Sequence, residues 1–477
     1  MTPTSSKAGV WLFSRASRVS RLTRQRTLEL SHPLQPLASF HSSPRPKTDG
    51  VFRELTESRV QTPWIQALRR QQQEGHDPTK ASSQPQTPTN RNLEPKRMSD
   101  SFHSVVLPLA RDPWLLDTYL NSSGHIRLGT IFMDLDALSG IIAYKHTGDD
   151  VTTVTAAVDR IVINHPLTEI CDLELSGQVT YATGRSSMEV SLQVAKMPKN
   201  GERPGKEDIM MTCGFTMVSL DLGTKKPVAI NPIKAETEEE RRLFEAGERN
   251  SKRRKESSQK SLLRTVPNDE ESDLIHAMWQ KQLQYHDPND PLRQPHNVHS
   301  MSTTSISSTA IMQPQFRNRH HFMIFGGFLL KSTFELAFCC AAAFSHSRPV
   351  FVSLDPSDFK HPVPVGSVLY LTATVVYNEP SMVGSKGTGG GTSSTEDGKA
   401  GSTRVQVRVD SKVRDVEHGD VKPTGQFNYT FSIPKDIKIM PRTYTEFMMW
   451  VDARRRSASV LESLEAGSSE SRDRVTE

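Results

Sequence analysis

The sequence predicts an α+β protein with two tandem, pseudo-symmetric domains, each an antiparallel sheet wrapped around one central helix. Two blocks of the chain match each other when one is shifted by 196 residues. Each block begins with an apolar stretch of helical spacing, and strand-like segments follow it. A nearly all-apolar helix buries its whole surface only if the sheet surrounds it, which is the packing that we expect.

The internal repeat supports this prediction most strongly. From Val158 to Tyr181, seven of 24 ungapped positions are identical to the residue 196 positions later, where about one or two would match by chance. The matching residues are Asp159, His165, Pro166, Leu173, Leu175, Val179 and Tyr181, which align with Asp355, His361, Pro362, Leu369, Leu371, Val375 and Tyr377. Similarity at a fixed offset indicates a duplicated structural unit.

The same order of elements is expected in both copies. The predicted helices cover residues 128–146 and 328–345, where apolar residues dominate and helix breakers are few. The predicted strands cover 151–163, 170–181, 188–195 and 209–220 in the first copy, and 350–354, 367–377, 404–413 and 425–433 in the second.

The first domain is expected over residues 101–230 and the second over 308–440. Between them, 231–307 is predicted to be a charged linker with a helix, because 14 of the 21 residues from 236 to 256 are charged. The other predicted segments are a disordered linker over 49–100, a flexible insertion with seven glycines over 379–403, and a C-terminal tail over 441–477.

Residues 1–48 have the composition of a mitochondrial transit peptide. They contain eight Lys or Arg residues against one acid, Glu29, and are rich in serine. Acid-poor, Arg-rich segments that form an amphipathic helix are typical of such leaders. We therefore expect mitochondrial import, with the matrix as the destination, and a disordered basic tail is the alternative interpretation.

Composition also argues against two classes of partner. The chain carries 59 basic and 54 acidic residues and no Lys/Arg stripe interleaved with aromatic residues, so no nucleic acid is expected. The longest uncharged apolar run, 322–330, is far shorter than the roughly 20 residues that span a bilayer. Stable membrane insertion is therefore not expected.

The second predicted helix is preceded by NRHHFMIFGG at 318–327, and the first copy contains SG at 176–177, RSSMEV at 185–190 and VSLD at 218–221. Together these segments resemble the mitochondrial double-hotdog acyl-CoA thioesterases. The resemblance implies two hotdog domains, hydrolysis of fatty acyl-CoA to free fatty acid and CoA, and no metal or organic cofactor. It also implies acyl-CoA as the bound substrate and a homo-oligomer of double-hotdog units.

Thioester hydrolysis needs a group that activates water and hydrogen-bond donors for the carbonyl oxygen. The family places a helix acid four residues before a glycine, and Asp136 with Gly140 matches this pattern, so Asp136 is the first candidate for the general base. Gly326 and Gly327 open the second helix, where backbone N–H groups lack partners within the helix and no Cβ blocks a carbonyl. Close packing of two backbones is the alternative explanation of these glycines.

Glu335 is a second catalytic candidate, because it is the only acid from 323 to 345 and a carboxylate on an apolar helix is either paired or functional. An i,i+4 pair with Lys331 is the alternative. At the offset of 196, Ser332 aligns with Asp136 and Ser139 with Glu335, so both helices carry an acid and a serine. We expect the two serines to contact the substrate.

The loop before the second helix supplies either His321 or Asn318 as the partner of the acid. The family usually has Asn or Asp a few residues ahead of the paired glycines, whereas this chain has His321 there and Asn318 further out. His125 aligns with His321, but the first copy has Thr130 and Ile131 in place of the glycines. The working site is therefore expected at the start of the second helix.

Two other functions fit part of the pattern. A hotdog hydratase or dehydratase would pair a nearby Asp and His, which Asp159 with His165 and Asp355 with His361 imitate loosely. A non-catalytic hotdog scaffold of a mitochondrial assembly would lack both helix acids, which this chain retains.

Overall fold

The structure, a computed structural model, describes residues 63–75, 93–163, 169–198, 204–222, 224–259, 262, 264–286, 289, 293–318, 322–379 and 402–472. The predicted transit peptide and most of the glycine-rich insertion lie outside these residues. The helices are α2 (Trp64–Gly75), α3 (Pro113–Tyr119), α4 (Leu128–Thr147), α5 (Glu238–Gln259), α6 (Asp269–Tyr285), α7 (Gly326–Ser345) and α8 (Tyr444–Arg472).

The strands of the first half are β1 (Lys96–Arg97), β2 (His103–Leu107), β3 (Val151–Val158), β4 (Ile161–Ile163), β5 (Leu173–Ala182), β6 (Ser187–Lys196), β7 (Ile209–Asp221) and β8 (Ile233–Lys234). Those of the second half are β9 (Val298–Ser300), β10 (Ile306–Ile311), β11 (Val350–Leu354), β12 (Ser357–Asp358), β13 (Val368–Asn378), β14 (Thr403–Arg414), β15 (Val421–Ile433) and β16 (Lys438–Met440). Strand β1 and helix α2 both fall in the predicted disordered linker, so that segment is not structureless throughout.

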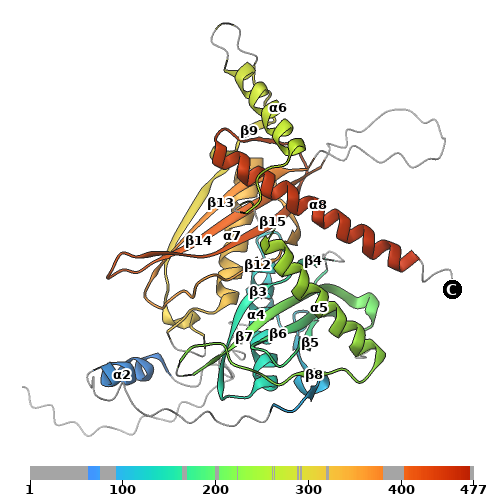
Figure 1. The fold of residues 1–477 in the computed structure, drawn as a ribbon, viewed down its shortest axis with the longest axis vertical. Coiled ribbons are helices and arrows are strands. Elements are labelled where there is room, and N and C mark those ends of the chain that lie inside the picture. The colour runs from blue at the N-terminus through green and yellow to red at the C-terminus, as the bar shows by residue number, and fades with distance from the viewer. Residues whose placement is uncertain are drawn as a thin grey trace, which may run out of the picture. The chain divides into compact units, whose positions relative to one another are not determined.

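A continuous antiparallel sheet of 12 strands runs through both domains (Figure 1). The order β2-β5-β6-β7-β4 forms the first half, with β3 also paired to β7, and the order β11-β15-β14-β13-β10 forms the second. The halves join where β4 pairs with β11, with Ile161 opposite Leu354. Seven of the eight predicted strand segments are single strands, and the eighth, 151–163, is divided into β3 and β4. The structure adds the edge strands β2 and β10, and β10 lacks apolar alternation because most of it is exposed.

The sheet wraps around two helices, α4 on all sides and α7 in part, since 9 of the 20 residues of α7 are buried. Helix α4 is buried on all sides, with 15 of its 20 residues inaccessible, as a helix inside a curled sheet must be. Among the described residues, α7 alone is long and apolar enough to cross a membrane, but here it packs against α4 and against strands β13 to β15. Each domain is therefore a hotdog fold, and the chain forms the predicted double hotdog.

The two central helices correspond at an offset of 198 residues rather than 196. Both are 20 residues long, they start at Leu128 and Gly326, and their C-caps Gly148 and His346 also correspond. The offset is 196 again at Asp159 and Asp355, whose N–H groups make equivalent backbone hydrogen bonds to β7 and β15. The connection between helix and sheet is thus two residues shorter in the second domain.

The predicted charged linker and the predicted C-terminal tail each contribute a helix that packs on the preceding domain (Figure 1). In each case an aromatic side chain of the helix contacts a strand tyrosine, and an arginine pairs with an aspartate that is largely removed from solvent. The contacts are Phe244–Tyr181 and Arg254–Asp159 for α5, and Trp450–Tyr377 and Arg456–Asp355 for α8. Both helices therefore belong to the folded unit, which the charge pattern did not indicate.

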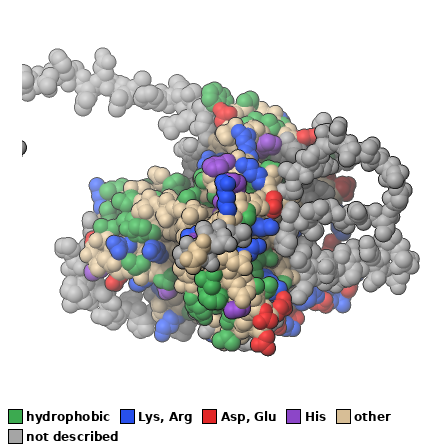
Figure 2. Space-filling model, turned by 90° about the horizontal axis from the view of Figure 1, so that it is seen from above, with side chains coloured by type: hydrophobic (Ala, Val, Ile, Leu, Met, Phe, Trp, Pro, Cys, Tyr) green, Lys and Arg blue, Asp and Glu red, His purple; other side chains and the backbone are tan. Residues whose placement is uncertain are grey.

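Charged side chains are interspersed on the surface. On the described part of the face drawn in Figure 2, hydrophobic, basic and acidic side chains follow one another over short distances. This distribution agrees with the near balance of 59 basic and 54 acidic residues. The absence of a nucleic-acid partner stays a prediction.

Candidate active site

Asp136 lies where the middle of α4 meets the start of α7. Its Oδ2 accepts a hydrogen bond from the Gly327 N–H at 2.6 Å, and its Oδ1 accepts one from the Thr155 hydroxyl at 2.7 Å. The side chain is only 3% exposed. The structure therefore brings together Asp136 and the paired glycines, and the two hydrogen bonds fix the direction of the carboxylate.

Gly327 is required by the close approach of the two helices. A Cβ at this position would lie 2.8 Å from the Met133 carbonyl oxygen and 2.9 Å from the Asp136 Cβ, distances that real side chains do not adopt. Close packing thus explains Gly327, as the alternative interpretation held, and its N–H also serves as a donor, to Asp136. The first turn of a helix has unpaired N–H groups and a positive dipole end, which stabilise a carboxylate placed there.

The pseudo-symmetric position of Asp136 is Phe334, not Ser332. Gly129 near the start of α4 corresponds to Gly327, and a Cβ on Gly129 would lie 3.3 Å from Phe334. The alignment at offset 196 is therefore wrong for the helices, because it ignores the two-residue difference in the connection that follows them. Only the start of α7 faces an acid at this helix position.

Glu335 lies on the side of α7 that faces the first domain. It accepts hydrogen bonds from the Arg127 Nε at 2.9 Å and Nη2 at 2.5 Å, so its partner is Arg127 at the N-cap of α4 rather than Lys331. Both side chains of this ion pair are about two-fifths exposed, at 41% and 39%. Glu335 is consequently paired and partly solvated.

The two predicted serines lie in different surroundings. Ser139 is fully buried, and its hydroxyl donates to the backbone carbonyl of Asp136 at 2.7 Å. The Ser332 hydroxyl donates to the Phe328 carbonyl at 2.8 Å and borders a cavity beside α7. Of the two, only Ser332 is placed to meet a ligand.

The loop before α7 begins at Asn318, and His321 falls outside the described residues. The Asn318 N–H donates to the Met323 carbonyl at 2.6 Å, and the equivalent Asn121 N–H donates to the His125 carbonyl at 2.9 Å. His125 thus corresponds to Met323 and not to His321. The shared Asn that opens both loops is the signal that sequence alignment could have used.

Thr155 is the site residue that the sequence did not predict. It lies on β3, and a Cβ at Gly326 would approach its Cβ to 3.4 Å and Asp136 Oδ2 to the same distance. A threonine in a strand is ordinary, so only the fold shows that this hydroxyl meets the carboxylate.

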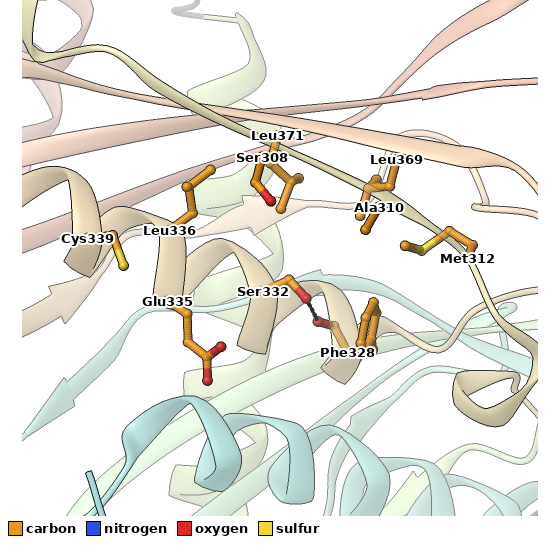
Figure 3. A pocket seen from close by; sticks show the side chains of 10 residues that line it. All are labelled: Ser308, Ala310, Met312, Phe328, Ser332, Glu335, Leu336, Cys339, Leu369 and Leu371. Carbon is orange, nitrogen blue, oxygen red and sulfur yellow. Dashed lines mark hydrogen bonds between the residues drawn. The ribbon is translucent and has the colours of Figure 1, made fainter. Parts of the chain in front are cut away.

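A cavity of about 280 Å³ lies along α7, and its lining begins at Phe328 without including Asp136, Gly327 or Thr155 (Figure 3). It lies between one face of α7 and strands β10 and β13. Most of its lining is apolar: Ala310, Met312, Phe328, Leu336, Leu369 and Leu371, with Ser308, Ser332, Glu335 and Cys339 completing it. In Figure 3 the Glu335 carboxylate points toward α4, away from these strands.

Asp134 is a second acid on α4, fully buried, whose Oδ2 accepts a hydrogen bond from the Tyr119 hydroxyl. Its Oδ1 makes no hydrogen bond to any described residue. Burial raises the pKa of Asp134 to about 7, while the Tyr119 hydrogen bond and the Lys331 charge act in the opposite direction. The fold therefore favours the protonated form of this acid.

We predict that Asp134 makes the fold less stable as the pH rises. Between the ordinary pKa of 3.8 and about 7, the folded chain binds a proton that the unfolded chain has lost, so stability falls with rising pH in this window. From pH 5 to pH 8, wild type should lose roughly 2–3 kcal/mol more unfolding free energy than Asp134→Asn. Urea unfolding at both pH values measures this. Exposed Asp117→Asn is the control, and equal losses in wild type and Asp134→Asn would contradict the prediction.

Within the described ranges, no three His, Cys, Asp or Glu side chains gather closely enough to hold a metal ion. The polar groups at the contact between α4 and α7 are instead a carboxylate, a hydroxyl and backbone N–H groups. Such a set can orient water, accept a proton and polarise a carbonyl.

Over most of its length the chain is similar to acyl-coenzyme A thioesterases. The chain is 33% identical over 380 residues to the mitochondrial acyl-coenzyme A thioesterase 9 of Mus musculus and to that of Homo sapiens, covering 77% of this chain and 80% and 79% of theirs. It is 35% identical over 298 residues to the chloroplastic acyl-coenzyme A thioesterase 2 of Humulus lupulus, covering 61% of this chain and 67% of that one.

Among solved structures, an apo-hexameric acyl-CoA thioesterase aligns at 28% identity with a TM-score of 0.30, covering 35% of this chain and 98% of that one. An acyl-ACP thioesterase from Bacteroides thetaiotaomicron aligns at 10% identity with a TM-score of 0.37, covering 70% and 100%. No protein-family model matches the chain.

Proposed function

The chain belongs to the acyl-CoA thioesterase family, and we propose that it hydrolyses fatty acyl-CoA where Asp136 meets the start of α7. The observation that carries this proposal is the hydrogen bond from the Gly327 N–H to the Asp136 carboxylate across the domain boundary. This contact supports a role for Asp136 as the general base, because it lies one hydrogen bond away from a helix start, where N–H groups can bind a carbonyl.

In the proposed reaction, Asp136 takes a proton from a water molecule as that water attacks the thioester carbonyl carbon. Negative charge then moves to the carbonyl oxygen, where the positive end of α7 and N–H groups of its first turn other than that of Gly327, which donates to Asp136, stabilise it. The intermediate collapses by breaking the C–S bond, and CoA leaves as a thiolate that takes up the proton. The products are a free fatty acid and CoA.

The proposed place of the carbonyl is beside the backbone of Gly326 at the start of α7, where no Cβ stands in the way. A Cβ on Gly326 would lie only 3.3–3.4 Å from Phe359, Asp136 Oδ2 and Thr155, which is tighter than an ordinary contact, so glycine suits this position. The acyl chain would then follow α7 from Phe328 into the largely apolar cavity beside it, with Ser332 on its wall. Asn318 or His321 would complete the site from the loop.

Thr155→Val is predicted to lower kcat about tenfold, because it removes the hydroxyl that fixes Asp136 Oδ1 and keeps the branched shape of the side chain. Steady-state thiol release measures this. Thr216→Val on β7 is the matched control, since the Thr216 hydroxyl makes no hydrogen bond to a described residue. Equal rates for both variants would show that Thr155 does not orient the base.

The proposed function is tested by thiol release from acyl-CoA substrates of short to long chain, using the purified full chain. Hydrolysis of at least one chain length, lost in Asp136→Asn, is expected. If the wild-type protein hydrolyses none of these acyl-CoA substrates, the proposal is refuted.

Location and assembly are part of the proposal. The names of the Mus musculus and Homo sapiens relatives support a mitochondrial location, and the Arg-rich, acid-poor residues 1–48 support import into the matrix. An assembly of several double-hotdog units is proposed from the family resemblance. Size-exclusion chromatography with light scattering would measure it.

The hydratase alternative has less support. The two acids that it needs are engaged elsewhere, because Asp159 pairs with Arg254 at 2.6 Å and Asp355 with Arg456 at 3.5 Å. His361 contacts the Pro423 carbonyl oxygen through Nδ1 at 2.7 Å, and His165 lies outside the described residues. These contacts account for both aspartates without catalysis.

A further inference from the structure

We infer that Trp64 is a positioning residue for catalysis, because α2 places its ring against both sides of the loop that leads into the active-site helix. This inference rests on the proposed function, since the loop carries Asn318 and ends at the glycines of α7. It concerns a segment far upstream in the chain, within the predicted disordered linker.

The loop returns on itself before α7 begins. Arg317 and Ile324 form an isolated antiparallel bridge, and the Asn318 N–H donates to the Met323 carbonyl at 2.6 Å. The N-cap of α7, Phe325, donates its N–H to the Phe316 carbonyl at 3.0 Å. A shift in this loop would therefore move the helix start that holds Asp136.

Trp64 contacts the incoming and the outgoing side of this loop at once. Its ring packs edge-on against Phe322 with 5.5 Å between centroids, and the Arg317 guanidinium carbon lies 6.0 Å from the Trp64 ring centroid. Ala67, one turn later on α2, is only 4% exposed, so this side of the helix is covered. Edge-on aromatic pairs and cation–π contacts are both attractive at these separations.

The equivalent loop of the first domain closes by its own contacts. The Asn121 Oδ1 accepts hydrogen bonds from the N–H groups of Ser123 and His125 at 2.8 and 3.1 Å. Gly124 supplies a φ of +76°, which favours glycine. The second loop has no glycine between Asn318 and Phe325. The Arg348 guanidinium also donates to the Ser123 hydroxyl of the first loop, so both loops are contacted from outside, and Trp64 contacts the one that belongs to the proposed working site.

Loss of the Trp64 ring is expected to release the loop without unfolding the domain. Removing two contacts of this kind should reduce the population of the catalytic conformation, and hence kcat, about tenfold. The effect should fall on kcat more than on KM, because the loop positions the reacting carbonyl and the α7 cavity that would hold the acyl chain contains no α2 residue.

The experiment measures kcat, KM and the melting temperature of full-chain Trp64→Ala, Trp64→Phe and Ile65→Ala. Ile65 is the matched control, because it is the next residue on α2 and is 53% exposed. We expect a tenfold lower kcat for Trp64→Ala with an unchanged melting temperature, recovery in Trp64→Phe, and wild-type kinetics for Ile65→Ala. In the double variant Trp64→Ala/Phe322→Ala, kcat should fall no further than in Trp64→Ala alone.

Other results would overturn the inference. Wild-type kcat in Trp64→Ala, with Asp136→Asn inactive, would refute the role of Trp64 and leave the proposed function standing. If Trp64→Ala lowers both kcat and the melting temperature, and Trp64→Phe restores neither, the role of Trp64 is purely structural. The same conclusion follows if the effects of Trp64→Ala and Phe322→Ala on kcat are additive in the double variant. If Asp136→Asn keeps wild-type activity, the proposed function itself fails.

Discussion

Replacing Asp136 with Asn is expected to lower kcat for acyl-CoA hydrolysis on the order of a hundredfold or more, with little change in KM. The amide keeps the size of the carboxylate and can still accept from the Gly327 N–H, so the contact between α4 and α7 survives. It cannot take a proton from water, and this loss is confined to the transition state. Steady-state thiol release over a range of acyl-CoA concentrations measures both constants.

The division between kcat and KM is what makes this result informative. A raised KM with unchanged kcat would mean that Asp136 binds substrate without acting on water. A loss of stability in the same variant would point to a structural carboxylate instead, so thermal unfolding is measured in parallel.

Gly327→Ala is expected to damage both the fold and the activity. The added Cβ would meet the Met133 carbonyl oxygen at 2.8 Å, and this backbone atom moves only if the helices separate. Overpacking of this kind lowers the free energy of unfolding by about 1–3 kcal/mol. Because a 1 Å displacement of a catalytic group lowers rates on the order of a hundredfold, kcat should fall by about that factor.

Gly140→Ala is the control for this prediction. Gly140 lies within α4, one turn after Asp136, and a Cβ there would meet nothing within 4 Å. Alanine favours the helix, so this variant should gain up to about 1 kcal/mol of stability and keep its activity. If Gly327→Ala behaved like Gly140→Ala, the helices would not approach as closely as described.

Much of the fold followed from the sequence because its signals are local. The hydrophobic periodicity of each helix and each strand can be recognised within a short segment of sequence. The internal repeat shows that the elements of the first domain correspond to those of the second. The meeting of Asp136 with Gly327 was predictable because an acid on an otherwise apolar helix and paired glycines at a helix start are both unusual.

The remainder depends on contacts between distant segments. The register of the two helices was misassigned because the connection after α7 is shorter by two residues, so Phe334 and not Ser332 is the equivalent of Asp136. The sequence around Thr155 does not distinguish it from other threonines in strands. The sequence around Trp64 does not distinguish it from other aromatic residues in linkers. The pair of Glu335 with Arg127 joins residues 208 positions apart, which no helical spacing rule reaches.

We propose that this chain has one working site, with Asp136 as its base, and that the counterpart site is inactive because Phe334 stands in place of the acid. The most direct test is the rate of thiol release by full-chain Asp136→Asn and Glu335→Gln at saturating acyl-CoA. We predict that Asp136→Asn loses on the order of a hundredfold or more, whereas Glu335→Gln stays within about threefold of wild type, because it breaks only a partly solvated ion pair. An inactive Glu335→Gln beside a fully active Asp136→Asn would contradict this claim and assign catalysis to the other site.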